Sequence, residues 1–152
     1  MTPQPPHPTE PHPGEPSEFS GAITTARDWL ADLLQRLQWT ERDTAFRALT
    51  ACLHALRDSL PEDEAGSLGV KLPPLIRGFY FDGWRPGLRS GASRTRAAFL
   101  ERIHDGVHRD PAIDPEQVAH AVFALLAARL PPTAIESARA ATPAQLHGLW
   151  PA

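Results

Sequence analysis

The chain matches itself when it is shifted by 70 positions without a gap, and this self-similarity restricts the fold more than any other feature. Apolar residues that differ between the two copies are exchanged for other apolar residues, as Tyr80 is for Trp150. A period of this length is typical of a duplicated supersecondary unit whose copies share one core. The identical pairs are Leu30 and Leu100, Ala51 and Ala121, Leu56 and Leu126, Leu60-Pro61 and Leu130-Pro131, Pro73 and Pro143, and Gly78 and Gly148.

Apolar residues recur at spacings of three and four, which predicts helices and an all-α fold. No segment alternates apolar and polar residues as a half-buried strand would. Two long helices are expected in the first half, and Thr40 is the predicted N-cap of the second, with Asp43 three residues later. Their apolar faces are Ile23, Ala26, Leu30, Leu33 and Leu37, and then Phe46, Leu49, Leu53, Leu56 and Leu60.

Two short helices should complete each half. Pro61 ends the second long helix, and the acidic residues 62–64 suit the first turn of a short helix that Gly69 closes. Pro73-Pro74 can open the next one, because the first N–H groups of a helix lack partners anyway. We therefore predict a helical bundle made of two tandem pseudo-repeats, each with two long and two short helices.

The second copy carries its own start signal. Asp114, Pro115 and Gln117 are the expected cap, first-turn proline and capping partner of a long helix. The segment that follows, residues 118–130, is apolar on nearly every side, so we expect it at the centre of the bundle.

Residues 1–18 contain seven of the 17 prolines and no large apolar residue after Met1. Such a segment buries too little surface to offset the entropy of ordering, which predicts a disordered tail. Residues 19–152 should form a single all-α domain. Within it we place repeat one at 19–82, a joint at 83–93, and repeat two at 94–152.

The charge balance limits the classes of partner. The tail has three acidic residues and no Lys or Arg, so the other 134 residues balance 15 basic against 15 acidic groups. A neutral body makes no overall electrostatic case for binding nucleic acid or an acidic membrane. A single cysteine suits a reducing compartment, and no signal-like or membrane-spanning segment is apparent, so we expect a cytoplasmic protein without membrane contact.

The stretch from Lys71 to Arg96 combines six basic residues with four aromatic ones and a single acid. Arginine beside aromatic rings suits phosphate contact with base stacking, and it equally suits protein interfaces. The alternative, which we favour, is that the aromatics wedge the halves together while the arginines are solvated or pair with residues 62–64. Residues 73–80 are similar to residues 143–150 of the second copy, and a feature shared by both copies supports the packing interpretation. The candidate binding residues are Arg77, Tyr80, Asp82, Trp84 and Arg85.

Two further features suggest chemistry only weakly. His104 and His108 would share a helix face and could reach one metal ion, but no third ligand is evident and Gly106 weakens the helix between them. Cys52 lies beside the apolar face and reads as a core residue. We therefore expect no catalytic residue, metal site or cofactor.

Four segments resemble a bacterial family of uncharacterised proteins, domain of unknown function 2267. They are "ALRDSLPEDEAGSLGVKLP" (55–73), "LPPLIRGFYFDGW" (72–84), "AAFLERI" (97–103) and "LHGLW" (146–150). The resemblance covers about residues 23–151 and implies an all-helical domain with two similar halves, without supplying a catalytic residue, cofactor or substrate. The chain departs from the family pattern at Thr142, where leucine is usual, and at His147, where arginine is common.

These observations favour a non-enzymatic module that binds a protein partner through the joint and the tail. Two alternatives stay open. The first is nucleic-acid binding through residues 71–96, and the second is small-ligand binding between the two repeats, because bundle interfaces often form pockets.

Overall fold

The computed structural model describes residues 13–87 and 94–152, and these residues form helices and short connections without a β-strand. The all-α prediction is therefore confirmed. In chain order the elements are α1 (Ser17–Leu37), α2 (Arg42–Ser59), α3 (Glu62–Gly69), α4 (Pro74–Phe81), α5 (Arg96–Gly106), α6 (Pro115–Arg129), α7 (Pro132–Ala141) and the 3₁₀ helix η2 (Ala144–Leu149).

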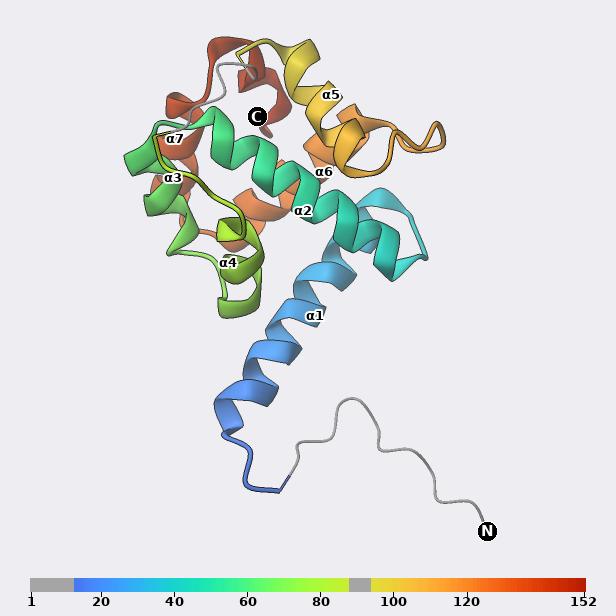
Figure 1. The fold of residues 1–152 in the computed structure, drawn as a ribbon, viewed down its shortest axis with the longest axis vertical. Helices are drawn as coiled ribbons and strands as arrows, with labels where there is room; N and C mark the ends of the chain where they lie inside the picture. Colours follow the sequence, from blue (N-terminus) through green and yellow to red (C-terminus); the bar gives the residue numbers. More distant parts are fainter. Residues whose placement is uncertain (1–12, 88–93) are drawn as a thin grey trace.

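The first helix is only half embedded in the body. Its buried residues are Trp29, Leu33 and Leu37, all in its C-terminal half. The N-terminal half projects away from the other helices (Figure 1), so Ile23, predicted as part of the buried face, is 37% exposed. Periodicity predicts which face of a helix is apolar, but it does not tell how far the rest of the domain extends along that face.

α2 begins at Arg42, one residue later than an N-cap at Thr40 would place it. Its N-cap is Glu41, which makes no capping hydrogen bond through its side chain, so the assignment of Thr40 as the cap is wrong. The reason lies in the end of α1. Gln38 adopts a left-handed conformation with φ of 59°, and Trp39 N–H donates to Leu34 O at 3.0 Å, which turns the chain before α2 can start.

Both short helices of the first half form where they were predicted. The acidic residues 62–64 occupy the first turn of α3, and Pro74 is the first residue of α4. Gly69 is the last residue of α3, as predicted, and packs closely against α4. A Cβ atom there would lie 2.2 Å from the Phe81 ring, so only glycine permits this approach between α3 and α4.

The second half contains four elements in the same order, with a 3₁₀ helix in the last place. The Asp114 carboxylate accepts from Glu116 N at 3.0 Å and caps α6, as expected. Gln117 is not its capping partner, because its Nε2 instead donates to Leu37 O in α1 at 3.2 Å. The central position of α6 is confirmed, since it packs against α1, α2, α5, α7 and η2.

The two halves interlock. α1 packs on α6 and α2 on α5, while α2 also meets α6 and α3 meets α7. If the two halves exchanged places, the α1–α6 contact would become the α2–α5 contact, whereas the α2–α6 and α3–α7 contacts would stay the same. Figure 1 shows α2 crossing the body between α4 and α5. One continuous core results, and its largest fully buried side chains include Tyr80, Phe99, Phe123, Leu33 and Leu53.

Local backbone geometry also recurs at positions 70 apart. His108 matches Gln38 in the alignment and shares its left-handed conformation, with φ of 58°. Arg109 N–H donates to His104 O at 2.8 Å, just as Trp39 N–H donates to Leu34 O. The turn that ends α1 thus has a counterpart that ends α5.

The predicted tail and joint extend beyond the part that can be described. Residues 1–12 of the tail and 88–93 of the joint lie outside the described residues, and the last two residues of the predicted tail, Ser17 and Glu18, belong to α1. Among the helices of the described residues, none combines the length and apolar character needed to cross a membrane.

Candidate functional site

Within the segment from Lys71 to Arg96, the C-terminal end of α4 is bound by a buried arginine of α2. Arg57 is 5% exposed, and its Nη1 donates to Tyr80 O and Asp82 O, both at 2.9 Å. These carbonyls lie at the C-terminal end of α4, where helix oxygens lack internal partners and the dipole is negative. Arg57 therefore caps α4 and fixes the start of the joint.

The same guanidinium forms a two-point pair with its neighbour in sequence. Arg57 Nε and Nη2 donate to the two carboxylate oxygens of Asp58 at 2.9 and 3.1 Å. Arg102 of α5 also pairs with Asp58, which connects the two halves through one carboxylate. Burial alone would raise the pKa of Asp58, but the hydrogen bond from Arg57 and the charges of both arginines hold it below its ordinary value.

A second α2 side chain binds the same end of α4. His54 Nε2 lies 2.7 Å from Phe79 O and donates to it in the tautomer with hydrogen on Nε2. Burial lowers the pKa of His54, and the charge of Arg57 lowers it further, against the opposing effect of the bond to Phe79 O. His54 and Arg57 thus bind three backbone carbonyls at the C-terminal end of α4, those of Phe79, Tyr80 and Asp82.

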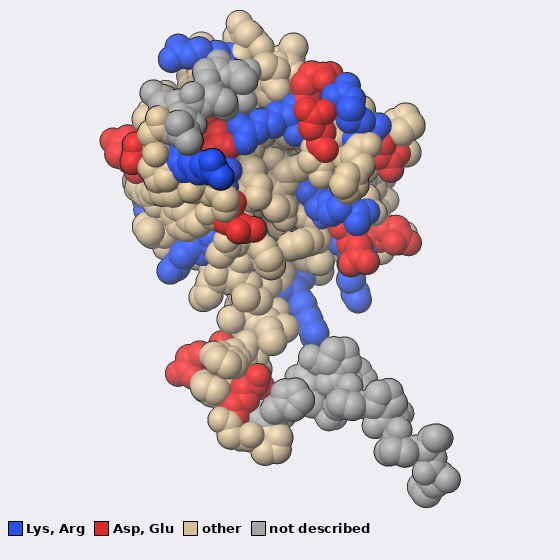
Figure 2. Space-filling model, viewed as in Figure 1, with Lys and Arg blue, Asp and Glu red and all other residues tan. Residues whose placement is uncertain are grey.

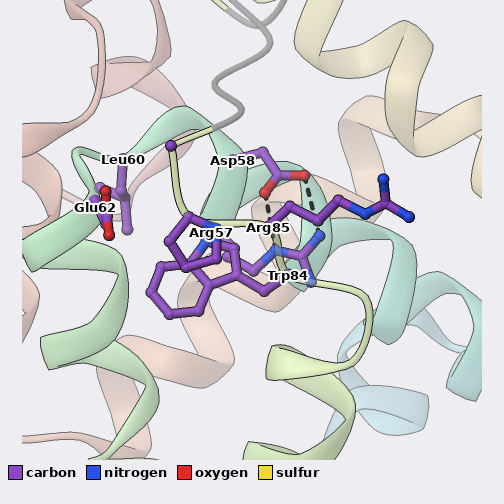
Figure 3. A pocket seen from close by; sticks show the side chains of 8 residues that line it. Arg57, Asp58, Leu60, Glu62, Trp84 and Arg85 are labelled. Atoms are coloured by element: carbon purple, nitrogen blue, oxygen red, sulfur yellow. Dashed lines mark hydrogen bonds and ion pairs between the residues drawn. The ribbon is translucent and has the colours of Figure 1, made fainter.

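Figure 3 shows the Arg57 guanidinium against the Asp58 carboxylate, while the side chain of Arg85 points away from the pair. A hollow of about 20 Å³ lies here, lined also by Trp84 and Glu62. That volume suffices for about one water molecule. The joint offers no space for a metabolite at this position.

Of the five predicted binding residues, the structure leaves three exposed and one half-buried. Tyr80 is fully buried and donates its hydroxyl to Ala65 O at 2.7 Å, so it is a packing residue and cannot contact a partner. Arg77 is exposed, but Nε and Nη2 both donate to Leu72 O, at 3.1 and 2.9 Å. Asp82 and Arg85 are exposed, and Trp84 is half-buried against the core.

The packing interpretation expected the arginines of this segment to be solvated or to pair with residues 62–64, and none of its described basic residues pairs with those acids. Lys71 bonds to Ser67 Oγ at 3.2 Å, and Arg96 pairs with Glu116. Arg85 and Arg94 are exposed and make no ion pair within the described residues. Figure 2 shows Lys and Arg interspersed with Asp and Glu over the visible face of the body, so this face presents no single-sign field.

A more extended apolar surface lies beside the joint, between α1, α2 and α4. Phe19 is 55% exposed, and Leu75 and Phe79 are each 39% exposed. The last two line a groove of about 150 Å³ that also contains Ile23, Ala26 and Leu30 of α1 and Phe46 and Leu49 of α2. Arg27 is the one charged residue that lines it. The Phe79 ring meets Phe46 edge-on, with centroids 4.8 Å apart.

One family model, described as "Uncharacterized conserved protein (DUF2267)", matches residues 26–149 of the chain. The chain belongs to this family. The match begins within α1, so the projecting turns around Phe19 and Ile23 precede it. No curated protein matches the chain.

At one position where the chain departs from the DUF2267 pattern, the substituted side chain makes the same backbone contact as its counterpart in the first half. His147 stands where we expected an arginine, and its Nε2 lies 2.9 Å from Thr142 O. The aligned pair in the first half is Arg77 and Leu72 O, which are also hydrogen-bonded. The side chain at this position therefore caps the preceding turn in both halves, and this accounts for Arg77 without a ligand.

The other titratable residues singled out from the sequence have structural roles. α5 ends at Gly106, so His108 lies beyond the helix, and the two-histidine helix face does not form. His104 Nε2 lies 3.0 Å from Asp110 O. Cys52 is fully buried, and this burial raises the pKa of its thiol, which confirms it as a core residue. In the described part of the chain, no three His, Cys, Asp or Glu side chains are grouped to hold a metal.

Sequence reasoning missed Arg57 and the groove. Arg57 follows Leu53 by four residues and Leu49 by eight, which places it on the apolar face of α2. That position was a signal, because an arginine on a buried face needs partners. The groove had no comparable signal, since it is formed by residues of three helices.

Proposed function

We propose that this member of the DUF2267 family is a non-enzymatic helical module that binds an amphipathic helix of a partner protein. The binding surface is the groove between α1, α2 and α4, together with the projecting half of α1. The observation that carries this proposal is the exposure of Phe19, Ile23, Leu75 and Phe79 around one apolar groove. Contiguous exposed apolar surface on a folded domain is typical of interaction sites.

The shape of the surface favours a helix as the occupant. Phe19, Ile23, Ala26 and Leu30 follow one another at spacings of four, three and four, which is the apolar seam of a coiled coil. The same seam is buried by the body further along α1, at Leu33 and Leu37. A helix with apolar residues at i, i+3 or i+4, and i+7 would continue this packing over the exposed half.

The charge of the groove adds a requirement for the partner. Arg27 lines the groove and makes no ion pair within residues 13–87 and 94–152. A partner helix should therefore carry an aspartate or glutamate beside its apolar anchors. Charge pairs of this kind at the rim contribute more to specificity and association rate than to affinity.

Two features support a binding role over catalysis or nucleic-acid contact. The candidate nucleophile Cys52 is buried, and the histidines at 54, 104 and 147 are bonded to backbone oxygens. Tyr80 is inaccessible, and Arg77 and Arg96 of the 71–96 segment are bonded within the chain. Among the described residues of the 71–96 segment, Arg85 and Arg94 are exposed and make no ion pair.

The test uses the full chain as bait in an extract of its native host, with Phe79→Glu and Leu75→Glu as variants. Ala140→Glu, which adds the same charge on exposed α7, is the matched control. We expect both groove variants, but not the control, to lose the same partner. Hydrogen exchange of the purified complex should then protect residues 17–30 and 74–81.

Retention of that partner by both groove variants would overturn the proposal. Loss of all retained material after nuclease treatment would favour the nucleic-acid alternative instead. Circular dichroism of each variant controls for unfolding, because Leu75 and Phe79 are partly buried and Phe79 contacts Phe46.

A further inference from the structure

Two loops meet at one end of the bundle and border an open cavity distinct from the groove. The loop between α1 and α2 and the loop between α5 and α6 lie on the same side of the body (Figure 1). Residues 38–41 and Thr44 line the cavity on one side, and Asp110, Ala112 and Ile113 line it on the other. Its volume of about 350 Å³ falls in the range of small-molecule sites. It lies between the two halves of the chain.

The side chains around this cavity combine an aromatic surface with negative charge. Trp39 is half-buried, and Ile113 forms a buried apolar part of the wall. Glu41 and Asp110 contribute carboxylates, and no Lys, Arg or His lines the cavity. The Glu41 carboxylate has no hydrogen-bond partner within the described residues, whereas one oxygen of Asp110 accepts from Ala112 N at 2.9 Å.

Two arginines adjoin these carboxylates in sequence, and Arg42, next to Glu41, does not line the cavity. Arg109, next to Asp110 in sequence, is paired with Glu101 at 2.9 Å and Asp105 at 2.6 Å. The C-terminal end of α1 and the N-terminal end of α2 both reach the cavity, so their dipoles have opposite signs there and largely offset each other. The two carboxylates therefore set the sign of the site.

The walls are held in place by specific bonds. The left-handed turn at Gln38 is closed by Trp39 N–H donating to Leu34 O, and Gln117 of α6 donates to Leu37 O. On the other side, His104 Nε2 bonds to Asp110 O. Non-glycine residues in this conformation cost about 1 kcal/mol and persist only where the surroundings fix them. The site is consequently present before any ligand arrives.

We propose that this cavity binds a small organic ammonium ion, with the cation against Trp39 and between the carboxylates of Glu41 and Asp110. An aromatic ring with nearby acids is the chemistry that recognises alkylated ammonium groups, because the ring quadrupole and the carboxylates both attract a weakly hydrated cation. This binding site goes beyond the proposed function and shares no residue with the groove.

Choline is the probe, and 3,3-dimethylbutan-1-ol is its neutral counterpart of the same shape. Titration of the full chain, followed by calorimetry and by tryptophan fluorescence, should show choline binding at least about tenfold more tightly than the alcohol. Added salt should weaken the binding of choline only. Equal affinity for both compounds, or no binding of choline, would overturn the proposal.

Variants locate the site. Glu41→Gln and Asp110→Asn should each weaken choline binding by about threefold or more, and the Asn side chain can still accept from Ala112 N. Trp39→Phe, which keeps an aromatic ring, should weaken choline binding more than either carboxylate variant does. Glu136→Gln on exposed α7 is the control and should leave the affinity unchanged. Unaltered affinity in all three cavity variants would place choline elsewhere and contradict the assignment.

Discussion

Arg57 Nη1 and the main-chain oxygen of Tyr80 are joined by a hydrogen bond of 2.9 Å that links α2 to the end of α4. Neither group has access to solvent, since Arg57 is 5% and Tyr80 0% exposed. The bond therefore replaces hydration that both groups lose on folding. It also determines where the joint leaves the body, because the same nitrogen holds Asp82 O.

Replacement of Arg57 by methionine should destabilise the fold strongly. The change would leave the buried Tyr80 carbonyl, the Asp82 carbonyl and the Asp58 carboxylate without their main donor, and loss of one partner from a buried pair costs about 3 kcal/mol or more. Urea unfolding measures this difference. Arg47→Met, on an exposed position of the same helix, should change stability by less than about 0.5 kcal/mol. Similar losses for both variants would contradict the role assigned to Arg57.

The pH dependence of stability should depend on Asp58. Its pKa in the folded protein lies below its ordinary value, whereas in the unfolded chain an aspartate titrates near about 3.9. The unfolded state therefore takes up a proton first as the pH falls, so this contribution is complete above about pH 5 and is lost toward the lower folded pKa.

Asp58→Asn should accordingly be less stable than the wild type at pH 7 but lose stability less steeply between about pH 5 and 3. Chemical denaturation at several pH values measures both slopes. The exposed Glu136→Gln variant should keep the wild-type slope. Parallel curves for Asp58→Asn and the wild type would show that the Arg57–Asp58 pair does not contribute to acid unfolding.

Two glycine-to-alanine substitutions in helices should change the stability of the protein in opposite directions. A Cβ atom at Gly106 would lie 2.4 Å from the Ala51 Cβ, at the contact of α5 with α2, whereas Gly21 in α1 has nothing within 4 Å. Gly21→Ala should stabilise the protein by about 0.5–1 kcal/mol through helix propensity. Gly106→Ala should destabilise it by about 1–3 kcal/mol through overpacking. Thermal unfolding reports both, and stabilisation by Gly106→Ala would refute the close approach.

The Cys52 thiol should be unreactive in the folded protein. It is completely buried, and burial raises its pKa, so neither access nor thiolate is available. Modification by a disulfide reagent at pH 8 should therefore proceed at the rate of unfolding, and it should be immediate in denaturant. Rapid modification without denaturant would mean that α2 is less well packed than described here.

The sequence predicted the helices well because their signals are local. Proline at 61 and 74, glycine at 69 and the aspartate at 114 act on the turns in which they occur, and each works as expected. Thr40 failed because a left-handed turn at Gln38 came first, and that turn has no marker in the sequence when glycine is absent.

The candidate site was predicted less completely, for a reason that Tyr80 makes clear. Spacing placed this residue in the right segment beside Arg77 and Trp84, but spacing carries no information on which side of α4 the body lies. Tyr80 faces the core, while Phe79, its neighbour, is partly exposed and lines the groove. From composition alone, Tyr80 and Phe79 were equally good candidates for a contact surface.

The order of helices, their approximate bounds and the apolar faces were encoded in neighbouring residues, since capping and helical periodicity act over one to a few turns. The partners of Arg57 and the groove beside Phe79 form only when α4 packs on α1 and α2. The cavity at Trp39 joins residues up to 75 positions apart, which meet only when the two halves pack together. Burial of charge and the shape of a surface are properties of that packing, so they appear only in three dimensions.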